Sequence, residues 1–290
     1  MRVAVIGPTG VLGRNLVPLL LQQGHSVRAL ARSAKKAEEL FGQTVEVMAC
    51  DLLADELEER LADMLLDCQA VMHIATAILK DFNAPGAWET NTRLRIEGTR
   101  RLLKASLEAG VQRYVQESIC MAYPDSGDKW ISEDTPLDTS PVRAVICEPV
   151  VRMEGMVRVT SINRLEWCIL RCGMFVGAGT FQERTAANIL SGTQKVLCDG
   201  SNFISPVHVK DAARAFAAAL IQPVAGVTLN INAEPLRQGA YLDHLADIVG
   251  GPRPARDFEQ PCPPSFRCSN HAAKALLGWN PVNSLYPEKM

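Results

Sequence analysis

A glycine-rich loop between a strand and a helix is the feature that most limits how this chain can fold. Residues 2–6 are a β-branched apolar run, typical of a strand buried in a parallel sheet. Gly7-Pro-Thr-Gly-Val-Leu-Gly13 follows at once and leads into apolar residues at helical spacing. In such a βαβ unit Gly7 permits a tight turn, Gly10 lets the backbone approach a pyrophosphate, and Gly13 lets the helix pack closely. The alternative is a glycine turn that binds nothing. We predict a dinucleotide site whose loop residues are Gly7, Thr9, Gly10, Val11, Leu12 and Gly13.

Strands and helices alternate along the first two thirds of the chain. The expected strands are 2–6, 26–30, 45–49, 70–75, 113–116 and 167–171, and helices are expected at 52–66, 87–109 and 150–160. This alternation predicts an α/β fold, a Rossmann-type doubly wound parallel sheet with right-handed crossovers. After residue 172 the periodicity weakens, and the segment 206–231 returns to the sheet. We therefore expect an NAD(P)-binding Rossmann domain at 1–172 plus 206–231, and a smaller C-terminal substrate lobe at 173–205 plus 232–290.

The end of the second strand bears on the choice between NAD and NADP. NAD sites commonly place an acidic residue there, about 20 residues past the loop, but residues 28–36 contain no Asp or Glu. A guanidinium suits a 2′-phosphate, so Arg28 and Arg32 predict NADP(H), with NAD(H) the less favoured cofactor. The alternative is a solvated basic start to a helix. Asp51 and Leu52, after the third strand, are expected beside the adenine, although Asp51 could instead cap a helix.

Composition argues against several classes of partner. The 290 residues include 30 basic and 32 acidic side chains, for a formal net charge of −2. Nucleic-acid binding needs a basic surface, and a membrane-spanning helix needs about 20 apolar residues, so neither partner is expected. The nine cysteines contain no CxxC pair, and those beside apolar segments, Cys198 among them, are interpreted as buried free thiols of a cytoplasmic protein. The predicted partner is a small-molecule substrate, without a metal, and a homodimer is compatible with the sequence.

Further motifs follow the loop in the order typical of one enzyme family. They are Val71–Ala75, Asn91–Thr99, Arg113–Val115, Leu170–Gly177, Val207–Asp211 and Leu277–Pro281. Through them the chain resembles, over nearly its whole length, the extended short-chain dehydrogenases/reductases, also called the NAD-dependent epimerase/dehydratase family. The resemblance implies oxidoreductase or epimerase/dehydratase chemistry and leaves the substrate open. It also implies cofactor contacts from Ile74, Ala75, Thr76 and Asn91.

The chain departs from this family where the proton-transfer pair belongs. Family members carry YxxxK on the helix after the fifth strand, with the tyrosine moving the proton and the lysine lowering its pKa. Registering Glu154 on the family's glutamate places Ile146 and Val150 at these two positions, and the sequence contains no YxxxK. The nearest hydroxyls belong to Ser118 and Tyr123, which we predict as the catalytic residues. The alternatives are a turn hydroxyl for Ser118 and a packing aromatic for Tyr123.

Two functions from different classes remain open at this point. The first is an atypical NAD(P)-dependent oxidoreductase or epimerase/dehydratase-like protein acting on a small hydrophobic carbonyl or alcohol substrate. The predicted apolar walls of its pocket are Met121, Trp130, Met174 and Phe175. The second is a non-catalytic NADP(H)-binding sensor or scaffold on the same fold, which the missing YxxxK favours.

Overall fold

The computed structural model describes residues 1–77, 84 and 86–288 of the chain, which forms two compact units. Unit 1 comprises Met1–Ser118, Asp138–Leu170 and Ala213–Thr228, and unit 2 comprises Ile119–Leu137, Arg171–Ala212 and Leu229–Met290. The elements lying wholly or mainly in unit 1 are β1 (Arg2–Ile6), α1 (Val11–Gln22), β2 (Ser26–Ala31), α2 (Ala34–Phe41), β3 (Glu46–Ala49), α3 (Leu61–Met64), β4 (Ala70–His73), α4 (Glu89–Arg93), the π-turn η3 (Leu94–Gly98), α5 (Thr99–Glu108), β5 (Arg113–Ile119), α6 (Ala144–Arg158), β7 (Glu166–Cys172) and α8 (Val209–Ala219). The strand β12 (Val227–Ile231) runs from unit 1 into unit 2. Those of unit 2 are β6 (Trp130–Ile131), β8 (Met174–Val176), α7 (Phe181–Leu190), β9 (Lys195–Leu197), β10 (Phe203–Ile204), β11 (Pro206–His208), β13 (Leu236–Arg237), α9 (Gln238–Val249), β14 (Ala255–Asp257), β15 (Arg267–Cys268) and α10 (His271–Leu277).

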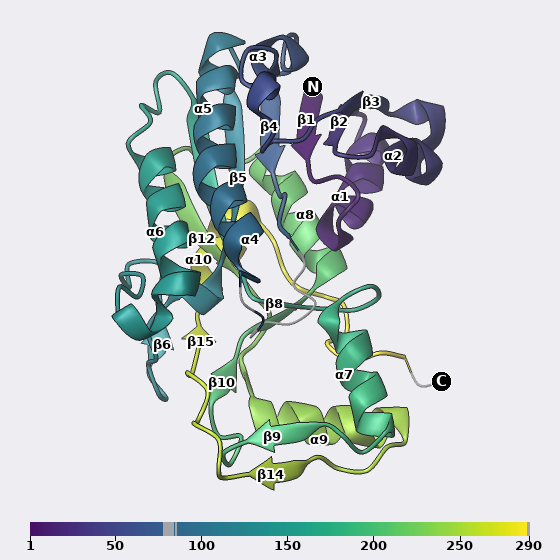
Figure 1. Ribbon diagram of the computed structural model, residues 1–290, viewed down its shortest axis with the longest axis vertical. Helices are drawn as coiled ribbons and strands as arrows, with labels where there is room; N and C mark the ends of the chain where they lie inside the picture. Colours follow the sequence, from purple (N-terminus) through teal and green to yellow (C-terminus); the bar gives the residue numbers. More distant parts are fainter. Residues whose placement is uncertain (78–83, 85, 289–290) are drawn as a thin grey trace. The chain divides into compact units, whose positions relative to one another are not determined.

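A seven-stranded sheet in the order β12-β7-β5-β4-β1-β2-β3 organises unit 1 (Figure 1). The pairs β1–β2, β1–β4, β2–β3 and β4–β5 are parallel, and their register aligns Ile6, His73 and Gln116 across three strands. The strand order turns around at β1, and ligands of open α/β sheets bind beyond the carboxyl ends of the strands at such a point. The predicted Rossmann-type α/β fold is therefore confirmed.

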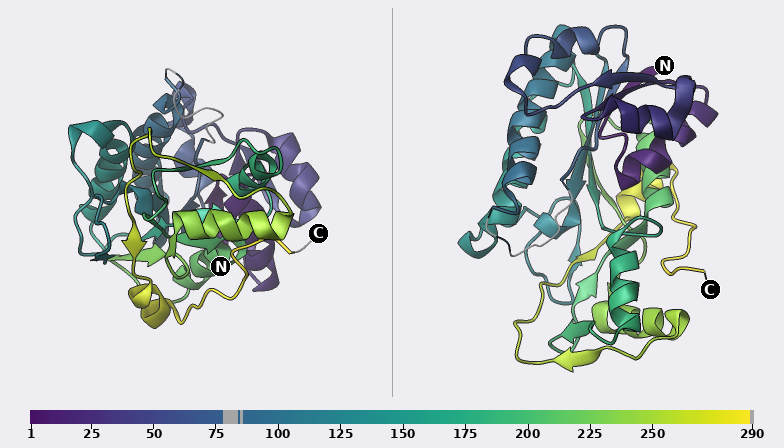
Figure 2. Two further views of the ribbon diagram at one scale, coloured as in Figure 1. Left: turned by 90° about the horizontal axis from the view of Figure 1, so that it is seen from below. Right: turned by 45° about the vertical axis from the view of Figure 1, so that its right-hand side comes forward.

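Helices cover both faces of this sheet because its strands are apolar on both faces. Val3, Ala4 and Val5 of β1 are fully buried, although they point alternately to opposite sides. The helices α1 and α2 cover one face, and α5 and α6 cover the other (Figures 1 and 2). The helix α1 buries Leu12, Leu16 and Leu20, the helical spacing expected from the sequence. Packing on both faces of the sheet holds each strand in place, so the carboxyl ends of the strands have defined positions along one edge of the sheet.

Unit 2 is built from short strand pairs and helices. Its two-stranded ladders are β10–β13, β11–β8, β14–β9 and β15–β6. The helix α7 packs against α9, with Ile189 and Leu245 in their shared apolar cluster. The sequence did not predict α7, because its apolar residues are few and its burial comes from the second helix.

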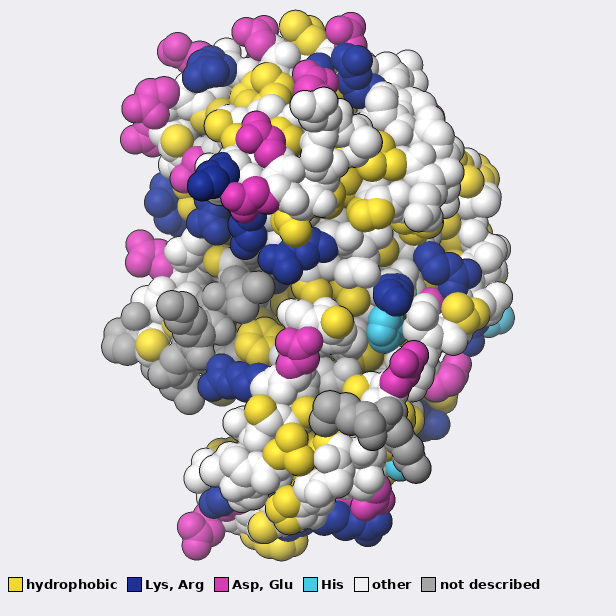
Figure 3. All heavy atoms as spheres, turned by 90° about the vertical axis from the view of Figure 1, so that its right-hand side faces the viewer, with side chains coloured by type: hydrophobic (Ala, Val, Ile, Leu, Met, Phe, Trp, Pro, Cys, Tyr) yellow, Lys and Arg dark blue, Asp and Glu magenta, His cyan; other side chains and the backbone are white. Residues whose placement is uncertain are grey.

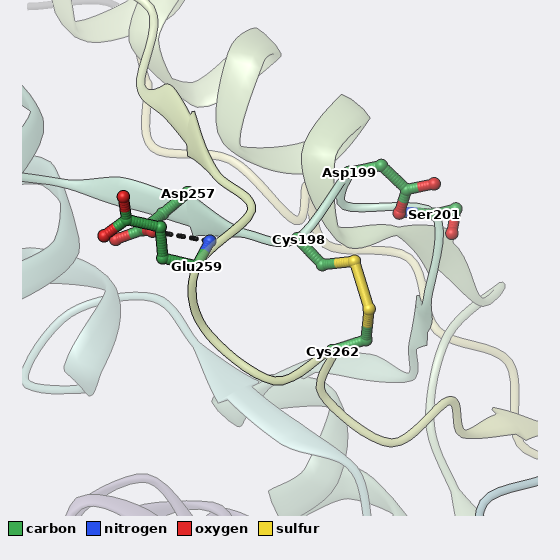
Figure 4. The surroundings of a disulfide bond; sticks show 6 residues. All are labelled: Cys198, Asp199, Ser201, Asp257, Glu259 and Cys262. Carbon is green, nitrogen blue, oxygen red and sulfur yellow. Dashed lines mark hydrogen bonds between the residues drawn. A yellow bond between two sulfur atoms is a disulfide. The ribbon is translucent and has the colours of Figure 1, made fainter.

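A disulfide bond in unit 2 corrects the interpretation of Cys198 as a buried free thiol. Cys198 is bonded to Cys262, with Cα atoms 5.0 Å apart and a sequence separation of 64 residues (Figure 4). The parallel pairing of β9 with β14 brings the two segments together, and Lys195 forms an ion pair with Asp257 across the same ladder. The sequence shows the apolar flank of Cys198 but not the ladder. The other seven cysteines are buried thiols.

Two further expectations about local structure are wrong. The segment 52–66 holds only a 3₁₀ turn at Asp55–Leu57 and the short α3, and it buries Leu57 and Leu61 without a continuous helix. The helix α6 begins at Ala144, earlier than the expected start at residue 150, and it runs through Pro149. A proline removes one backbone donor, and the packing of Val150 and Met153 in the core maintains the helix.

The described part of the chain contains no helix of the length and apolarity needed to cross a bilayer. Acidic and basic side chains both occur over the face shown in Figure 3, in keeping with a net charge of −2.

Candidate functional site

The three loop glycines are needed for different reasons. Gly7 has φ +93°, and a Cβ there would lie 2.7 Å from the Cα of Ala75. A Cβ on Gly13 would lie 2.3 Å from the carbonyl oxygen of Pro8. Gly10 has φ −72°, and the nearest atom to a Cβ would be the Gly7 carbonyl oxygen at 3.4 Å. Nothing in the described chain therefore requires a glycine at position 10, and the absence of a side chain there would let a ligand approach the backbone.

The helix α1 begins at this loop with donors available for an anion. Gly10 is the N-cap residue, no side chain caps the helix, and its first turn carries no acidic residue. The first N–H groups and the positive end of the helix dipole are thus not neutralised by the helix itself. Thr9, Val11 and Leu12 supply backbone to this turn, and the Leu12 side chain is buried. The arrangement suits the pyrophosphate of a dinucleotide.

The segment after β4 lies beside the loop. The N–H of Ile74 donates to the carbonyl of Ile6, and Ala75 lies against Gly7. Thr76 is exposed. Asn91 is engaged with the backbone of Ala77: its Oδ1 accepts from the N–H at 2.8 Å, and its Nδ2 donates to the carbonyl at 2.7 Å. Asn91 therefore fixes the path of the chain that follows β4.

The two arginines predicted for a 2′-phosphate lie in different surroundings. Arg28 is 7% exposed, and its guanidinium donates to the carbonyl oxygens of Met64 and Leu66. Its Nε also lies 2.9 Å from the carboxylate of Glu46. Arg28 is thus committed to structural contacts, because it lies in the middle of β2. Arg32, just beyond the strand, is exposed and has no partner among the residues described.

Asp51 and Leu52 follow β3 on the same edge. Asp51 is exposed, and its Oδ1 accepts from the N–H of Leu53 at 3.1 Å. Leu52 is buried, and its carbonyl accepts from Arg101 at 2.7 Å. Asp51 thus presents a carboxylate at the surface, while the Leu52 side chain packs in the hydrophobic core.

Ser118 joins the end of β5 to α6. Its side chain is fully buried, and its hydroxyl donates to Oε1 of Glu154 at 2.6 Å. Arg158 lies 3.2 Å from the second oxygen of Glu154. One and two turns earlier, α6 carries Val150 and Ile146, the two residues at the expected YxxxK positions. A catalytic role of Ser118 stays a prediction, and its hydroxyl is committed to Glu154 in this structure.

Tyr123 lies in unit 2 and is also fully buried. Its hydroxyl donates to Oδ1 of Asn230 at 2.8 Å and accepts from Arg171 at 2.6 Å. Burial raises the pKa of Tyr123 above its ordinary value, although Arg171 lowers it. A general acid must come within hydrogen-bond reach of its substrate, so a catalytic role of Tyr123 stays a prediction that these buried contacts do not favour.

Two buried charged residues of unit 1 were not predicted from the sequence. Glu117 on β5 is 7% exposed, and Arg95 in the π-turn η3 is 9% exposed. Burial raises the pKa of Glu117 to about 7, and the positive charge of Arg95 opposes this rise. A signal was present, because Gln116, Glu117 and Ser118 are three consecutive polar residues in a strand expected to be buried. Charged residues are almost never fully buried unless paired.

His73 belongs to a neighbouring polar network. Its Nδ1 lies 3.1 Å from Oε1 of Gln116 and 3.3 Å from the hydroxyl of Tyr114. Burial lowers the pKa of His73 to about 4. The imidazole is therefore neutral near pH 7 and links β4 to β5.

A hollow is present among the described residues of each unit. A cavity of about 340 Å³ in unit 1 is lined by Met1, Gln69 and Gln112 at the amino ends of the strands, the edge opposite the glycine loop. A cavity of about 120 Å³ in unit 2 is lined by Met174, Phe175, Val176, Phe181, Gln182, Thr185, Gln194, Ile204, Gln238, Tyr241 and Leu242. Two of the predicted apolar walls thus line this cavity. Trp130 is instead covered by the Arg267 guanidinium, 4.2 Å from its ring centre.

The parallel sheet, the glycine loop and the uncapped helix define a dinucleotide-binding α/β protein. A model of the NAD dependent epimerase/dehydratase family matches residues 3–232, and the chain belongs to that family. The chain is 32% identical to a 3-diazoavenalumate denitrifying reductase of a Streptomyces species, over 98% of this chain and 97% of the relative. It is 26% identical to a 3-beta-hydroxysteroid dehydrogenase of Mycolicibacterium neoaurum, over 98% of this chain and 78% of the relative.

Solved structures share the fold at lower identity. A UDP-glucose 4-epimerase of Thermotoga maritima with UDP-glucose has a TM-score of 0.81 at 20% identity, over 98% of this chain and 95% of that one. A UDP-glucose 4-epimerase of Thermus thermophilus in complex with NAD has a TM-score of 0.81 at 22% identity, with the same coverage. These likenesses establish the fold.

Proposed function

We propose that the protein is an NAD(P)H-dependent reductase that acts on a small, largely apolar substrate. The observation that carries this proposal is the glycine at position 10, where a Cβ would make only one contact, at 3.4 Å, so packing within the described chain does not explain the glycine. Family membership supports oxidoreductase chemistry. The 32% identity to a reductase over nearly the full length of both chains favours reduction over epimerisation. A reduced nicotinamide, when bound, supplies hydride.

Different residues on the carboxyl edge of the sheet would bind different parts of the cofactor. Gly7–Gly13 would hold the pyrophosphate, Asp51 would lie beside the adenosine, and Ile74–Thr76 would line the path toward the nicotinamide. We favour NADP(H) over NAD(H), because Arg32 is exposed at the end of β2 and no carboxylate accompanies it. Arg28 does not take part, because its donors are used by Met64 and Leu66.

The substrate we propose is a small hydrophobic carbonyl or alcohol. The unit 2 cavity has Met174 and Phe175 in its lining, and no Lys, Arg, Asp or Glu among its lining residues. A nucleotide sugar carries a diphosphate, which is commonly bound by arginine or lysine. An apolar or aromatic substrate fits this lining better.

A diazo compound is a second candidate substrate, favoured by the name of the Streptomyces relative. Reduction of a neutral diazo carbon takes one proton and one hydride at carbon, and dinitrogen leaves with the electron pair of the broken C–N bond. The same hydride chemistry therefore serves both candidates. Fold analogy does not choose between them.

Turnover measurements with NADPH and NADH test this function. The panel contains aromatic aldehydes, ketones and an ortho-diazophenol, and the readouts are loss of reduced nicotinamide and release of dinitrogen. We expect oxidation of the cofactor with at least one acceptor. Binding without turnover on any acceptor would support the non-catalytic sensor or scaffold instead. Absence of binding at millimolar cofactor would overturn both functions.

The remaining expectations are proposals of the same kind. We propose that residues 1–172 plus 206–231 bind the cofactor and that 173–205 plus 232–290 bind the substrate. A cytoplasmic location is tested by cell fractionation together with the redox state of Cys198 and Cys262. A homodimer is tested by light scattering.

A further inference from the structure

Glu117 lies at the level of the glycine loop on the carboxyl edge of the sheet. The register aligns Ile6 of β1, His73 of β4 and Gln116 of β5. One residue further along each strand come Gly7, Ile74 and Glu117. Gly7 begins the predicted cofactor loop, so Glu117 is two strands away at the edge where open α/β sheets bind ligands.

Glu117 and Arg95 are buried charges that the protein leaves without hydrogen bonds. Their exposed fractions are 7% and 9%. Within the described ranges, no donor bonds to the Glu117 carboxyl and no acceptor bonds to the Arg95 guanidinium. The polar atoms of these two side chains are not among the fully enclosed atoms that lack a partner, so they border accessible space. Buried polar groups are normally satisfied, and an exception calls for an explanation. A ligand or ordered water that forms hydrogen bonds with the Glu117 carboxyl and the Arg95 guanidinium is a physical explanation.

The charges around this pair balance. Arg95 interacts electrostatically with Glu117, Glu154 and the Cys147 thiol, and burial lowers the pKa of its guanidinium. Glu154 is already bonded to Ser118 and paired with Arg158. Arg95 and Glu117 therefore interact electrostatically, without an ion pair among the described contacts. Burial raises the pKa of Glu117 to about 7, which leaves it partly protonated at neutral pH.

Arg95 also lies beside the face of α6 that lacks the expected lysine. The π-turn η3 packs against α6, and Arg95 interacts with Cys147 and Glu154 of that helix. These two residues are seven apart and share one face with Val150 between them, the position where the resemblance expects lysine. Arg95 thus provides a positive charge near the position of Val150, but from a different helix. Single turns of π-helix within α-helices, such as Leu94–Gly98, are often found at functional sites.

We infer that Glu117 is the general acid that protonates the substrate and that Arg95 is a positioning residue that stabilises the resulting carboxylate. The inference rests on the proposed reductase function. For a carbonyl, the proton leaves the Glu117 carboxyl for the oxygen that takes the π-electron pair as hydride reaches carbon. For a diazo compound, the same proton goes to the diazo carbon. Hydride then forms a C–H bond at that carbon as the C–N bond breaks, and dinitrogen leaves as a further product with the electron pair of the broken bond. The products are the reduced substrate, oxidised nicotinamide and the Glu117 carboxylate, which solvent reprotonates.

The central experiment compares Glu117→Gln with Glu108→Gln, an exposed glutamate on α5 as the matched control. With the acceptor found in the panel, we expect Glu117→Gln to lower kcat at least roughly a hundredfold, with KM and cofactor Kd within about twofold. In the parent, kcat should fall as pH rises through about 7, because the acid must be protonated. His73, which also feels Arg95, has a pKa of about 4 and does not titrate in this range. Parental kcat and pH profile in Glu117→Gln would overturn the inference while leaving the reductase function intact.

Two further measurements do not depend on Glu117→Gln being well folded. Infrared titration of the apo protein should show a protonated carboxyl that ionises near pH 7 and is missing in Glu117→Gln. Arg95→Met should move this ionisation and the fall in kcat to higher pH, and Arg95→Lys should restore both toward the parent. An unchanged pH profile in Arg95→Met would reject the role of Arg95. A parent without turnover on any acceptor would overturn the reductase function, and the catalytic role of Glu117 with it.

Discussion

Gly10 and Gly13 lie within four residues of each other, but the space around their Cα atoms differs. A Cβ on Gly13 would meet the carbonyl of Pro8 at 2.3 Å, whereas a Cβ on Gly10 meets no atom closer than 3.4 Å. The sequence presents both as members of one motif. Only the backbone shows that Gly13 is required by packing within the protein, whereas nothing within the described chain requires Gly10.

Gly10→Ala should keep the fold and lose the cofactor. Its φ of −72° is suitable for alanine, so the free energy of unfolding should change by no more than about 1 kcal/mol. The methyl group occupies the space above the loop, so calorimetry should show at least tenfold weaker dinucleotide binding. Gly13→Ala is the matched control and should lower Tm. Tight binding by Gly10→Ala would show that the space is not a pyrophosphate site.

Arg32→Ala should erode a preference for NADPH over NADH. A charge-assisted contact to phosphate contributes about 1.5–3 kcal/mol, which is roughly tenfold or more in Kd. NADH affinity should hardly change, because its adenosine ribose carries no 2′-phosphate. Arg164→Ala removes an exposed positive charge elsewhere in unit 1 and serves as the control. Equal parental affinities for the two cofactors would reject NADP specificity.

The packing of helices and strands brings together side chains whose interaction partners could not be predicted from the sequence. Ser118 was predicted from its place after the fifth strand, but only the packing of α6 on that strand shows Glu154 as its partner. Arg95 lies in a helical segment that the sequence predicted correctly, yet a helix prediction does not specify which helix it faces. Pairing between elements distant in sequence is decided by tertiary packing, and local patterns do not contain it.

Ser118→Ala tests whether this hydroxyl is structural or catalytic. The substitution leaves one buried oxygen of Glu154 without its donor, which costs about 1–3 kcal/mol. We expect a lower Tm with kcat within about threefold of the parent. Thermal unfolding and turnover should be measured on the same preparation, with Ser191→Ala, an exposed serine, as control. A large fall in kcat at unchanged Tm would support the catalytic role predicted from the sequence.

At the scale of the whole molecule, much of the fold could be predicted from strand and helix periodicity. The parallel sheet and the cofactor edge follow from apolar strands alternating with helices. The predictions failed where contacts outside the segment decide the outcome: at the helix Phe181–Leu190 and the bond between Cys198 and Cys262. The same limit applies to Arg28, whose burial depends on the loop at Met64–Leu66.

The pH dependence of global stability should reflect two buried groups acting in opposite directions. The pKa of Glu117 rises from 4.5 to about 7 on folding, so its contribution falls as pH rises through that window. The pKa of His73 falls from 6.5 to about 4, so its contribution falls as pH drops through that window. Each amounts to roughly 3 kcal/mol at its limit. Between pH 4.5 and 6.5 the two effects oppose each other.

Glu117→Gln should therefore become steeply acid-sensitive. Urea unfolding between pH 6.5 and 4.5 should show a loss of stability in this variant larger than in the parent by roughly 3 kcal/mol. Carboxylates with lowered pKa values act below this window and do not interfere. Glu108→Gln should follow the parent. Parallel curves for Glu117→Gln and the parent would mean that Glu117 ionises normally in the folded protein.

The carboxylate of Asp211 makes the start of α8 depend on a segment about seventy residues further along the chain. It is fully buried in unit 2, where the N–H groups of Val282 and Asn283 donate to its Oδ2 at 3.1 and 2.9 Å. The indole N–H of Trp279 donates to the Asp211 carbonyl. These donors are synthesised about seventy residues after the acceptor that they serve. The hydrogen bonds of this buried carboxylate at the start of α8 are therefore complete only when the segment near residue 283 packs against it.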